Sequence, residues 1–372
     1  MCSGNWEEER MSSLIGKKLK VSVFGESHGR GIGAVIDGFP PGVEIDMAEL
    51  SRFMDRRRPG RDKTSTPRKE SDRPDILSGV LDGVTCGTPV AAVIANNDQR
   101  SGDYRNVAHE ARPGHADYTG YIRYNGYNDV RGGGHFSARL TAPLVFAGGL
   151  CLQYLAKQGI TIGAHLKSVA GIKDDSFEPC DLTEEELRKP GFRTFPVIRE
   201  SAEEEMRAVI ENARLAGDSV GGVVEVAVLG MPPGVGSPMF DTVEGRLAYA
   251  FYGIPAVKGV SFGAGFQAAL MRGSENNDEF YIENETIRTR TNHHGGILGG
   301  ITSGMPVLAE IAFKPTPSIA MPQKTVDYVK RTETVMQVKG RHDPCVAVRA
   351  VPVVEAVTAI VIMDLLLEEG RV

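Results

Sequence analysis

The feature that most constrains the fold is an apolar stretch near the C-terminus. It runs from Ala350 to Leu367 and is interrupted by only two charged residues, Glu355 and Asp364. Its length approaches that of a membrane-spanning helix, but charged side chains are costly inside a bilayer. The stretch therefore predicts a helix buried in a protein core rather than a membrane span.

A second core helix is predicted between Ser137 and Gly159. The apolar residues recur there at helical spacing, and Pro143 lies near enough to the start to be tolerated. Gly159 supplies the stop signal. Two long apolar helices favour a large globular core.

A β-hairpin with a polar tip is predicted near the N-terminus. Residues 19–24 alternate as in a strand, a turn begins at Gly25, and a second apolar strand spans residues 32–36. Farther along, Asp46 is in position to cap a helix that runs through Met54.

The rest of the chain shows no clean domain boundary. Residues 173–199, rich in acidic residues and proline, are expected to form an exposed connection. Two pairs of similar segments, SHGRGIGAVIDG with HHGGILGGITSG and SARLTAPLV with AVRAVPVV, suggest an internal duplication. We therefore predict one compact α+β domain over residues 16–372, preceded by an acidic leader over residues 1–15.

Composition narrows the class of protein. The net charge of the 372 residues is -6, which argues against a nucleic-acid or membrane-surface binder because such proteins usually present a basic face. The five cysteines are scattered and lack CxxC spacing, which argues against a disulfide framework or a structural zinc site. We expect a cytoplasmic protein with reduced cysteines.

The predicted hairpin tip reads Gly25-Glu26-Ser27-His28-Gly29 and places a hydroxyl beside an imidazole. An exposed proton donor is the functional interpretation, because histidine can change its charge near neutral pH. The alternative is an ordinary solvated loop histidine.

A basic loop is expected after the first helix. Arg56-Arg57-Arg58-Pro59-Gly60-Arg61-Asp62-Lys63 could face solvent and chelate phosphate and carboxylate oxygens. The alternatives are a solvated charged loop and a site for RNA. No aromatic residue occurs between Phe53 and Tyr104, so the loop lacks the stacking platforms of a single-strand binder.

Glycine-rich and histidine-containing segments follow. Arg112 to Tyr118 and Asp129 to Arg139 could bind phosphate or a ring through backbone amides, although tight turns explain such glycines nearly as well. Late in the chain, His293 and His294 are adjacent. They leave open a metal-dependent phosphohydrolase, but zinc ligands usually have other spacings and a supporting carboxylate. We predict no metal site.

Taken in order, GESHG, RRRPG, RPGHADYTG, RGGGHFSARLTA, NHHGGILGG, KPTPS and GRHDPC closely resemble the chorismate synthase family. The resemblance covers about residues 16–367. It implies a β-α-β sandwich with core helices between antiparallel sheets, a homotetramer, and reduced FMN as cofactor. It also implies anti-1,4-elimination of phosphate from 5-enolpyruvylshikimate 3-phosphate, giving chorismate without net oxidation or reduction.

The resemblance assigns roles to matching positions. His28 would protonate the departing phosphate, and His115 would hold reduced flavin in the correct protonation state. Ser27, Ser137 and Asp343 would complete the proton relay, with Asp343 helping flavin N5 act as a base. The anionic substrate would be bound by Arg57, Lys63, Arg139 and Arg341.

Positions matching flavin contacts are His135, Phe136, Ser137, Ala256, Gly299, Lys314, Pro315, Thr316, Pro317, Ser318 and Arg341. The chain departs from the commonest family pattern at some positions. His135-Phe136 replaces Arg-Ser, Leu140 replaces Glu, and Pro255 stands where Asn is frequent. Backbone contacts could survive there, and His135 could donate a hydrogen bond. No nicotinamide fingerprint is visible, so NADPH enters only as a candidate reductant.

Overall fold

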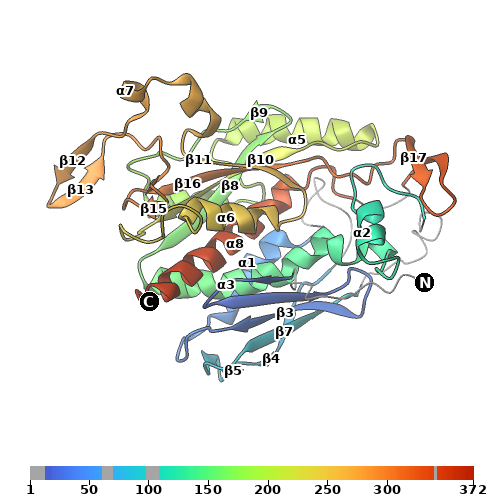
Figure 1. Ribbon diagram of the computed structural model, residues 1–372, viewed down its shortest axis with the longest axis horizontal. Helices are drawn as coiled ribbons and strands as arrows, with labels where there is room; N and C mark the ends of the chain where they lie inside the picture. Colours follow the sequence, from blue (N-terminus) through green and yellow to red (C-terminus); the bar gives the residue numbers. More distant parts are fainter. Residues whose placement is uncertain (1–12, 61–69, 98–108, 339–341) are drawn as a thin grey trace.

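The computed structural model of the chain describes residues 13–60, 70–97, 109–338 and 342–372 (Figure 1). Two five-stranded antiparallel sheets form its framework. In spatial order, the first sheet consists of β1 (Leu14–Ile15), β2 (Lys20–Gly25), β3 (Gly31–Asp37), β7 (Val90–Ala95) and β4 (Pro74–Ser78). The second consists of β11 (Val257–Phe262), β16 (Val307–Phe313), β10 (Gly222–Leu229), β8 (Thr161–Val169) and β9 (Ile172–Lys173).

Three helices lie between the sheets (Figure 1): α1 (Met47–Arg57), α3 (Thr141–Lys157) and α8 (Ala347–Glu368). Helix α3 packs against β3 and β7 of the first sheet, α8 packs against β8 and β10 of the second, and the two helices pack along each other. The expected α+β class with antiparallel sheets is confirmed.

The C-terminal apolar stretch forms α8, as predicted, and 94% of its most apolar window is buried inside the protein. Its two acidic residues have partners. Glu355 accepts two hydrogen bonds from Arg56, at 2.6 and 2.8 Å, and one from the amide of Ala164. Asp364 accepts from the amides of residues 17–19 and from Arg246. Because buried carboxylates must be compensated, each fixes the helix to a neighbouring segment.

Helix α3 begins later than the predicted Ser137. Two short 3₁₀ segments, η2 (Arg131–Phe136) and η3 (Ala138–Leu140), precede it, and Ser137 accepts a hydrogen bond from the amide of Arg139. By length and composition α3 could also cross a membrane, but 72% of its apolar window is buried. A Cβ at Gly148 would overlap Ala356, so glycine permits the close crossing of α3 and α8.

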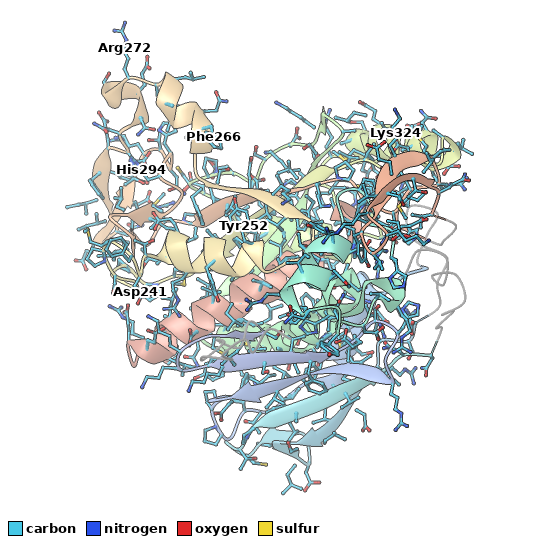
Figure 2. The ribbon with its side chains drawn as sticks, turned by 45° about the vertical axis from the view of Figure 1, so that its right-hand side comes forward. Asp241, Tyr252, Phe266, Arg272, His294 and Lys324 are labelled. Carbon is cyan, nitrogen blue, oxygen red and sulfur yellow. The ribbon has the colours of Figure 1, made fainter. Side chains whose placement is uncertain are left out.

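The remaining elements surround this core. The helices are α2 (Asp117–Arg123), α4 (Glu184–Arg188), η4 (Lys189–Phe192), α5 (Glu200–Leu215), α6 (Val243–Tyr252), η5 (Gly265–Leu270) and α7 (Gly273–Asn276). The small antiparallel pairs are β5 (Val80–Leu81) with β6 (Val84–Thr85), β12 (Phe280–Glu283) with β13 (Thr286–Thr289), β14 (Ile297–Leu298) with β15 (Ile301–Thr302), and β17 (Gln323–Asp327) with β18 (Thr332–Met336). Helix α7 and the β12–β13 hairpin project to one side, whereas β17 lies beside α2 at the other (Figures 1 and 2).

The predicted β2–β3 hairpin and the Asp46 cap are both observed. Residues 173–199 are not the exposed connection that was expected. They contain α4 and bury Phe177 and Leu187 in a second apolar cluster with residues of β10 and β16. Because acidic residues and prolines dominate this segment, its composition does not indicate that a few apolar residues are buried. The internal duplication stays a prediction, although its second pair of segments falls at the starts of α3 and α8.

Candidate active site

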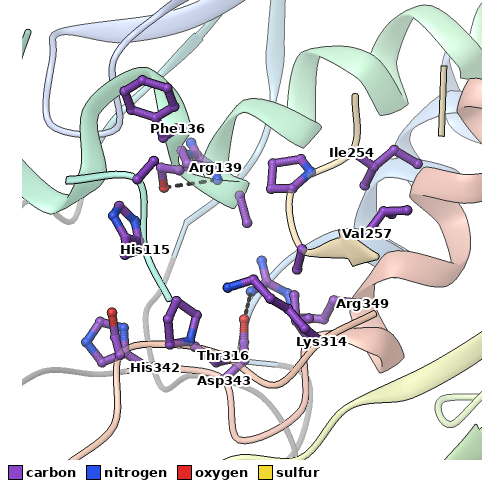
Figure 3. Close-up of a pocket in the computed structure, with 18 of the residues that line it drawn as sticks. His115, Phe136, Arg139, Ile254, Val257, Lys314, Thr316, His342, Asp343 and Arg349 are labelled. Carbon is purple, nitrogen blue, oxygen red and sulfur yellow. Dashed lines mark hydrogen bonds and ion pairs between the residues drawn. The ribbon is translucent and has the colours of Figure 1, made fainter. Parts of the chain in front are cut away.

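A cavity of about 470 Å³ opens where η2 and η3 meet the chain before β11, the segment after β16 and the start of α8 (Figure 3). This volume suits a small ligand. The sequence-predicted residues that line it are Arg57, His115, His135, Phe136, Ser137, Arg139, Ala256, Lys314, Thr316, Pro317, Ser318 and Asp343. Segments distant in the sequence therefore meet at one place, as a single site requires.

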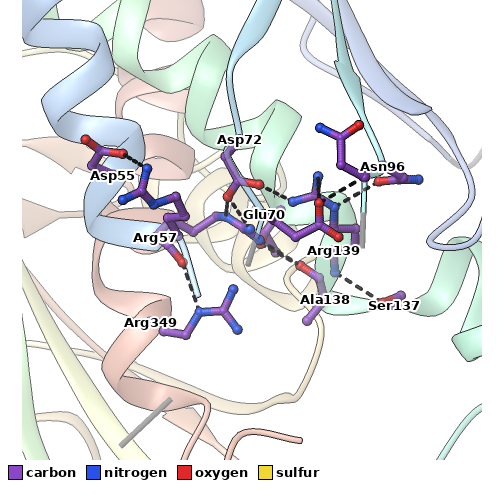
Figure 4. Close-up of polar contacts among 12 residues, drawn as sticks. Asp55, Arg57, Glu70, Asp72, Asn96, Ser137, Ala138, Arg139 and Arg349 are labelled. Atoms are coloured by element: carbon purple, nitrogen blue, oxygen red, sulfur yellow. Dashed lines mark hydrogen bonds and ion pairs between the residues drawn. The ribbon is translucent and has the colours of Figure 1, made fainter. Parts of the chain in front are cut away.

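Two guanidinium groups form one wall of the cavity (Figure 4). Arg57 and Arg139 both bind Asp72, which is 2% exposed, and Arg139 also donates to Asn96 at 3.0 Å. Burial would raise the pKa of Asp72, but the two guanidiniums hold it below its usual value. Asp72 compensates one of the two positive charges, and the Glu70 carboxylate lies 3.6 Å from Arg139.

Arg57 differs from its prediction as part of a solvent-facing loop. It is the last residue of α1, is 2% exposed, and donates to Thr141 at 3.2 Å as well as to Asp72. Burial lowers the pKa of Arg57 to about 10. The helix continues past the predicted Met54 to Arg57, and the buried partners of this guanidinium are not evident from the sequence of α1 alone. Lys63 and Arg341 lie outside the described residues.

The RGGGH segment lies between the two histidines expected to carry protons. Gly132, Gly133 and Gly134 have φ angles of 63°, 102° and 53°. These angles favour glycine, and a Cβ at Gly132 would overlap the His28 ring. A Cβ at Gly133 would lie 3.1 Å from Nε2 of His115. The glycines thus let the backbone pass close to both imidazoles.

His28 is buried, 4% exposed, so the prediction of an exposed donor at a hairpin tip was wrong. The tip packs against η2, where the amide of Ser27 donates to the carbonyl of Gly134 at 3.2 Å. The Ser27 hydroxyl lies 3.2 Å from Nδ1 of His28. Neither side chain lines the cavity, but His28 abuts Gly132, which does.

His115 forms a cluster with Arg112, which is buried, and Asp117, which like His115 is partly buried. Its Nδ1 lies 2.7 Å from Oδ1 of Asp117, and Arg112 donates to the same carboxylate through Nε at 2.7 Å and Nη2 at 2.6 Å. Burial would raise the pKa of Asp117, but hydrogen bonds from Arg112 and His115 hold it well below its usual range. The RPGHADYTG motif assigned a role to His115 but none to Arg112 or Asp117.

The departures from the family pattern have defined surroundings. His135 donates from Nδ1 to the carbonyl of Gly25 at 2.9 Å, and its Nε2 lies 2.8 Å from the Ser13 hydroxyl. Phe136 packs near Tyr124, with a ring separation of 6.2 Å. Leu140 is buried in the core. These side chains stabilise the cavity wall, and Pro255 lines it.

The opposite wall is basic and contains an unusual backbone. Ala256 has φ of 76°, a conformation that costs free energy for a residue with a Cβ, and its carbonyl accepts from the amide of Lys314 at 2.9 Å. Burial and the nearby charge of Lys258 lower the pKa of Lys314. The buried hydroxyl of Thr316 has no hydrogen-bond partner within the described part of the protein.

Asp343 reaches the cavity from the segment before α8. Its carboxylate accepts from Arg349 at 2.6 Å, and Nε of Arg349 donates to the carbonyl of Arg57 at 2.9 Å. Arg349 and His342 also line the cavity and were not predicted, although both stand in segments singled out in the sequence. Gly299, in the β14–β15 turn, and Pro315 are not among the lining residues.

Comparison with known proteins decides the family. The family described as chorismate synthase matches residues 19–367. The chain belongs to the chorismate synthase family. Relatives named chorismate synthase include those of Pyrococcus abyssi, 49% identical, and Korarchaeum cryptofilum, 45% identical. The alignments cover 95% and 96% of this chain and 97% and 98% of the relatives.

A solved structure titled "Crystal Structure of Chorismate Synthase" is 30% identical and superposes with a TM-score of 0.75 over 95% of this chain and 93% of that one. Membership in the family makes the chain a lyase of the shikimate pathway. Among the described residues, no group of three or more His, Cys, Asp or Glu side chains could hold a metal ion.

Proposed function

We propose that the chain converts 5-enolpyruvylshikimate 3-phosphate into chorismate by anti-1,4-elimination of phosphate, with reduced FMN and no net redox change. The observation that carries the proposal is the convergence of Arg57, Arg139, His115 and Lys314 on one cavity in a chain of this family. A substrate with one phosphate and two carboxylates needs such cations in a site of low water content.

The buried guanidiniums would bind the anionic substrate. Arg57 and Arg139 are held by Asp72 before any ligand arrives, so little side-chain entropy is lost when a phosphate or carboxylate binds. Arg349, fixed by Asp343, extends the same wall. Lys63 and Arg341 remain proposed contributors on the basis of the family resemblance.

The opposite wall fits a flavin phosphate and ring. Lys314 supplies a partly buried cation, and the hydroxyl of Thr316 is an orphaned polar group that a ligand oxygen could satisfy. Phe136, Ala256, Pro317 and Ser318 would contact the remainder of the cofactor, and Gly299 and Pro315 are proposed from the resemblance. When bound, reduced flavin would supply electron density to the substrate and recover it.

The proton transfers are assigned to side chains around the glycine segment. His28, next to Ser27, would protonate the departing phosphate, and His115 would hold the proton of the reduced cofactor. Asp343 would assist removal of the hydrogen at carbon 6, with Ser137 completing the relay. The contact of His28 with Gly132, which lines the cavity, supports a donor at this wall.

The test is an anaerobic assay of the purified chain with 5-enolpyruvylshikimate 3-phosphate and chemically reduced FMN. We expect chorismate and phosphate in equal amounts and many turnovers for each flavin reduction. Oxidised FMN and flavin-free protein are the controls, and both should be inactive. Equal yield without flavin, or one flavin oxidised for each product formed, would contradict the proposal. Adding NADPH with oxidised FMN then shows whether the chain reduces its own cofactor.

We also propose a homotetramer and a cytoplasmic location. Exposed apolar residues on the projecting β12–β13 hairpin, Phe280, Ile282 and Ile287, support association with other copies. The four cysteines that the structure describes are unpaired, which suits a reducing compartment. Light scattering after size exclusion measures the assembly, and a monomer at micromolar concentration would exclude it. The β-α-β sandwich of the family is supported by the two sheets and the helices between them.

A further inference from the structure

We propose that Asp117 is a positioning residue for His115. Its carboxylate fixes a proton on Nδ1 of the imidazole, so that Nε2 is the nitrogen that exchanges a proton at the cavity. The inference rests on the proposed function, in which His115 serves the reduced cofactor, and it extends that function to a residue with no direct contact with the reacting atoms.

The contacts of Nδ1 indicate which nitrogen carries the proton. An ionised carboxylate only accepts, so the 2.7 Å approach of Oδ1 of Asp117 to Nδ1 of His115 is favourable when Nδ1 carries a proton. Nη2 of Arg112 lies 3.2 Å from the same Nδ1. Nη2 could donate to Nδ1 only in the other tautomer, but the same Nη2 makes a shorter bond, 2.6 Å, to Oδ1 of Asp117, and that oxygen lies nearer to Nδ1 than Nη2 does.

The other nitrogen is left to the ligand. Nε2 of His115 faces Gly133 on the cavity wall, and no hydrogen bond to it is found within the described residues. It can accept a proton when the ring is neutral and donate one when the ring is charged. With the proton on Nδ1 fixed, only Nε2, on the cavity side, can gain or lose a proton.

Arg112 keeps Asp117 in the required state. It is 4% exposed, is held by Ser318 at 3.3 Å, and gives Asp117 three hydrogen bonds from its backbone amide, Nε and Nη2. The carboxylate therefore remains ionised at neutral pH and acts only as an acceptor. Other charged or titratable groups near His115 include Lys314, which donates to the carbonyl of Gly114, and His342, which also lines the cavity (Figure 3).

Replacing Asp117 with asparagine tests the assignment without removing bulk. The amide can donate to Nδ1, which moves the ring proton to Nε2 and presents a donor where an acceptor is needed. Nitrogen-15 NMR of histidine-labelled, flavin-free protein, with the His115 signal identified from His115→Gln, should show the Nδ1–H tautomer in the wild type. Asp117→Asn should shift it toward Nε2–H. A wild-type Nε2–H tautomer would overturn the proposal, whether or not the chain makes chorismate.

Kinetics supply the second readout. We expect kcat of Asp117→Asn to fall roughly 10²-fold, within the range for loss of acid–base function, with a smaller change in KM. Because Asp117 acts through His115, the double variant with His115→Gln should be no slower than His115→Gln alone. If the fold-losses in kcat of the two single variants multiplied in the double variant, the positioning role would be overturned.

A matched control distinguishes positioning from general stabilisation. Asp174 is a buried carboxylate 3.2 Å from Nδ1 of His165, and neither residue lines the cavity. Asp174→Asn should lower the unfolding midpoint while the folded fraction keeps near wild-type kcat. If Asp174→Asn reduced kcat as much as Asp117→Asn, loss of a buried carboxylate would explain both and the proposal would fail. Should Asp117→Asn not fold, Asp117→Glu gives the same NMR comparison and is expected to retain Nδ1–H.

Discussion

His115, which is partly buried, and His165, which is fully buried, both lie beside a carboxylate, and they differ in what their second nitrogen does. In the cavity, Nδ1 of His115 lies 2.7 Å from Oδ1 of Asp117, and Nε2 faces the wall at Gly133. In the second sheet, Nδ1 of His165 lies 3.2 Å from Asp174, and Nε2 lies 2.7 Å from Glu225. A histidine satisfied on both sides can hold structure, whereas one satisfied on a single side can also exchange a proton.

The surroundings of His165 support a structural role. The ring is fully buried, and Asp174 also accepts the amides of Ile198 and Arg199. Glu225 accepts the amide of Phe177. Burial would lower the pKa of His165, but the two carboxylates raise it above the usual value. The charged triad thus ties residues 173–199 to the second sheet.

The largest effect on activity is expected from His115→Ala. If Nε2 exchanges a proton with the cofactor, turnover should fall roughly 10²–10⁴-fold while the free energy of unfolding changes by about 1 kcal/mol or less. The spectrum of bound reduced flavin should also change. His165→Ala is the comparison and should behave in the opposite way. Wild-type turnover of a folded, flavin-loaded His115→Ala enzyme would remove the histidine from the reaction.

The largest effect on stability is expected from Glu225→Ala. It leaves His165 and the nearby Lys167 without their shared carboxylate, 2.7 and 3.6 Å away. Breaking a buried ion pair from one side costs roughly 3–5 kcal/mol, measurable by urea unfolding. The folded fraction should keep its kcat. A loss of kcat with unchanged stability would show that the second sheet takes part in the chemistry.

The pH dependence of stability should carry the signature of the same triad. Because the pKa of His165 is raised on folding, its contribution is full below the unfolded value of about 6.5 and is lost as pH rises through the folded value. The pKa values of Asp174 and Glu225 are lowered, so their contribution is lost as pH falls through the folded values. The difference in unfolding free energy between wild type and His165→Gln should therefore shrink above neutral pH. A difference that grows with pH would mean that His165 is neutral.

The sequence predicted those features whose signals lie in one continuous segment and missed those that depend on contacts between distant segments. The helix α8 was predicted because its apolar pattern is continuous, and the β2–β3 hairpin because alternation and a glycine turn are local. The burial of His28 depends on packing against Gly132, more than a hundred positions away, and no local pattern reports it. The same holds for Arg57, whose partner Asp72 stands 15 positions farther along the chain.

The site was predicted unevenly for the same reason. Family motifs led to twelve of the residues that line the cavity, and these were residues expected to touch ligands rather than residues that orient them. Asp117 had a usable signal, because Arg112, His115 and Asp117 stand within six positions and can share one turn. Arg349 had none, since its two partners become neighbours only when α8 packs against α1.

The smallest effect is expected from Ser13→Ala, which extends the comparison to a third histidine. His135 lines the cavity, yet Nδ1 donates to the carbonyl of Gly25 and Nε2 accepts from the Ser13 hydroxyl. By the argument drawn from His165, a ring satisfied on both nitrogens holds the wall in place. Loss of the hydroxyl should therefore cost about 0.5–1.5 kcal/mol of stability and leave kcat nearly unchanged. Urea unfolding and the anaerobic assay, run on the same preparation, measure both quantities. A tenfold fall in kcat without loss of stability would show that Nε2 of His135 also serves the reaction, and engagement of both nitrogens would then no longer separate structural from functional histidines in this protein.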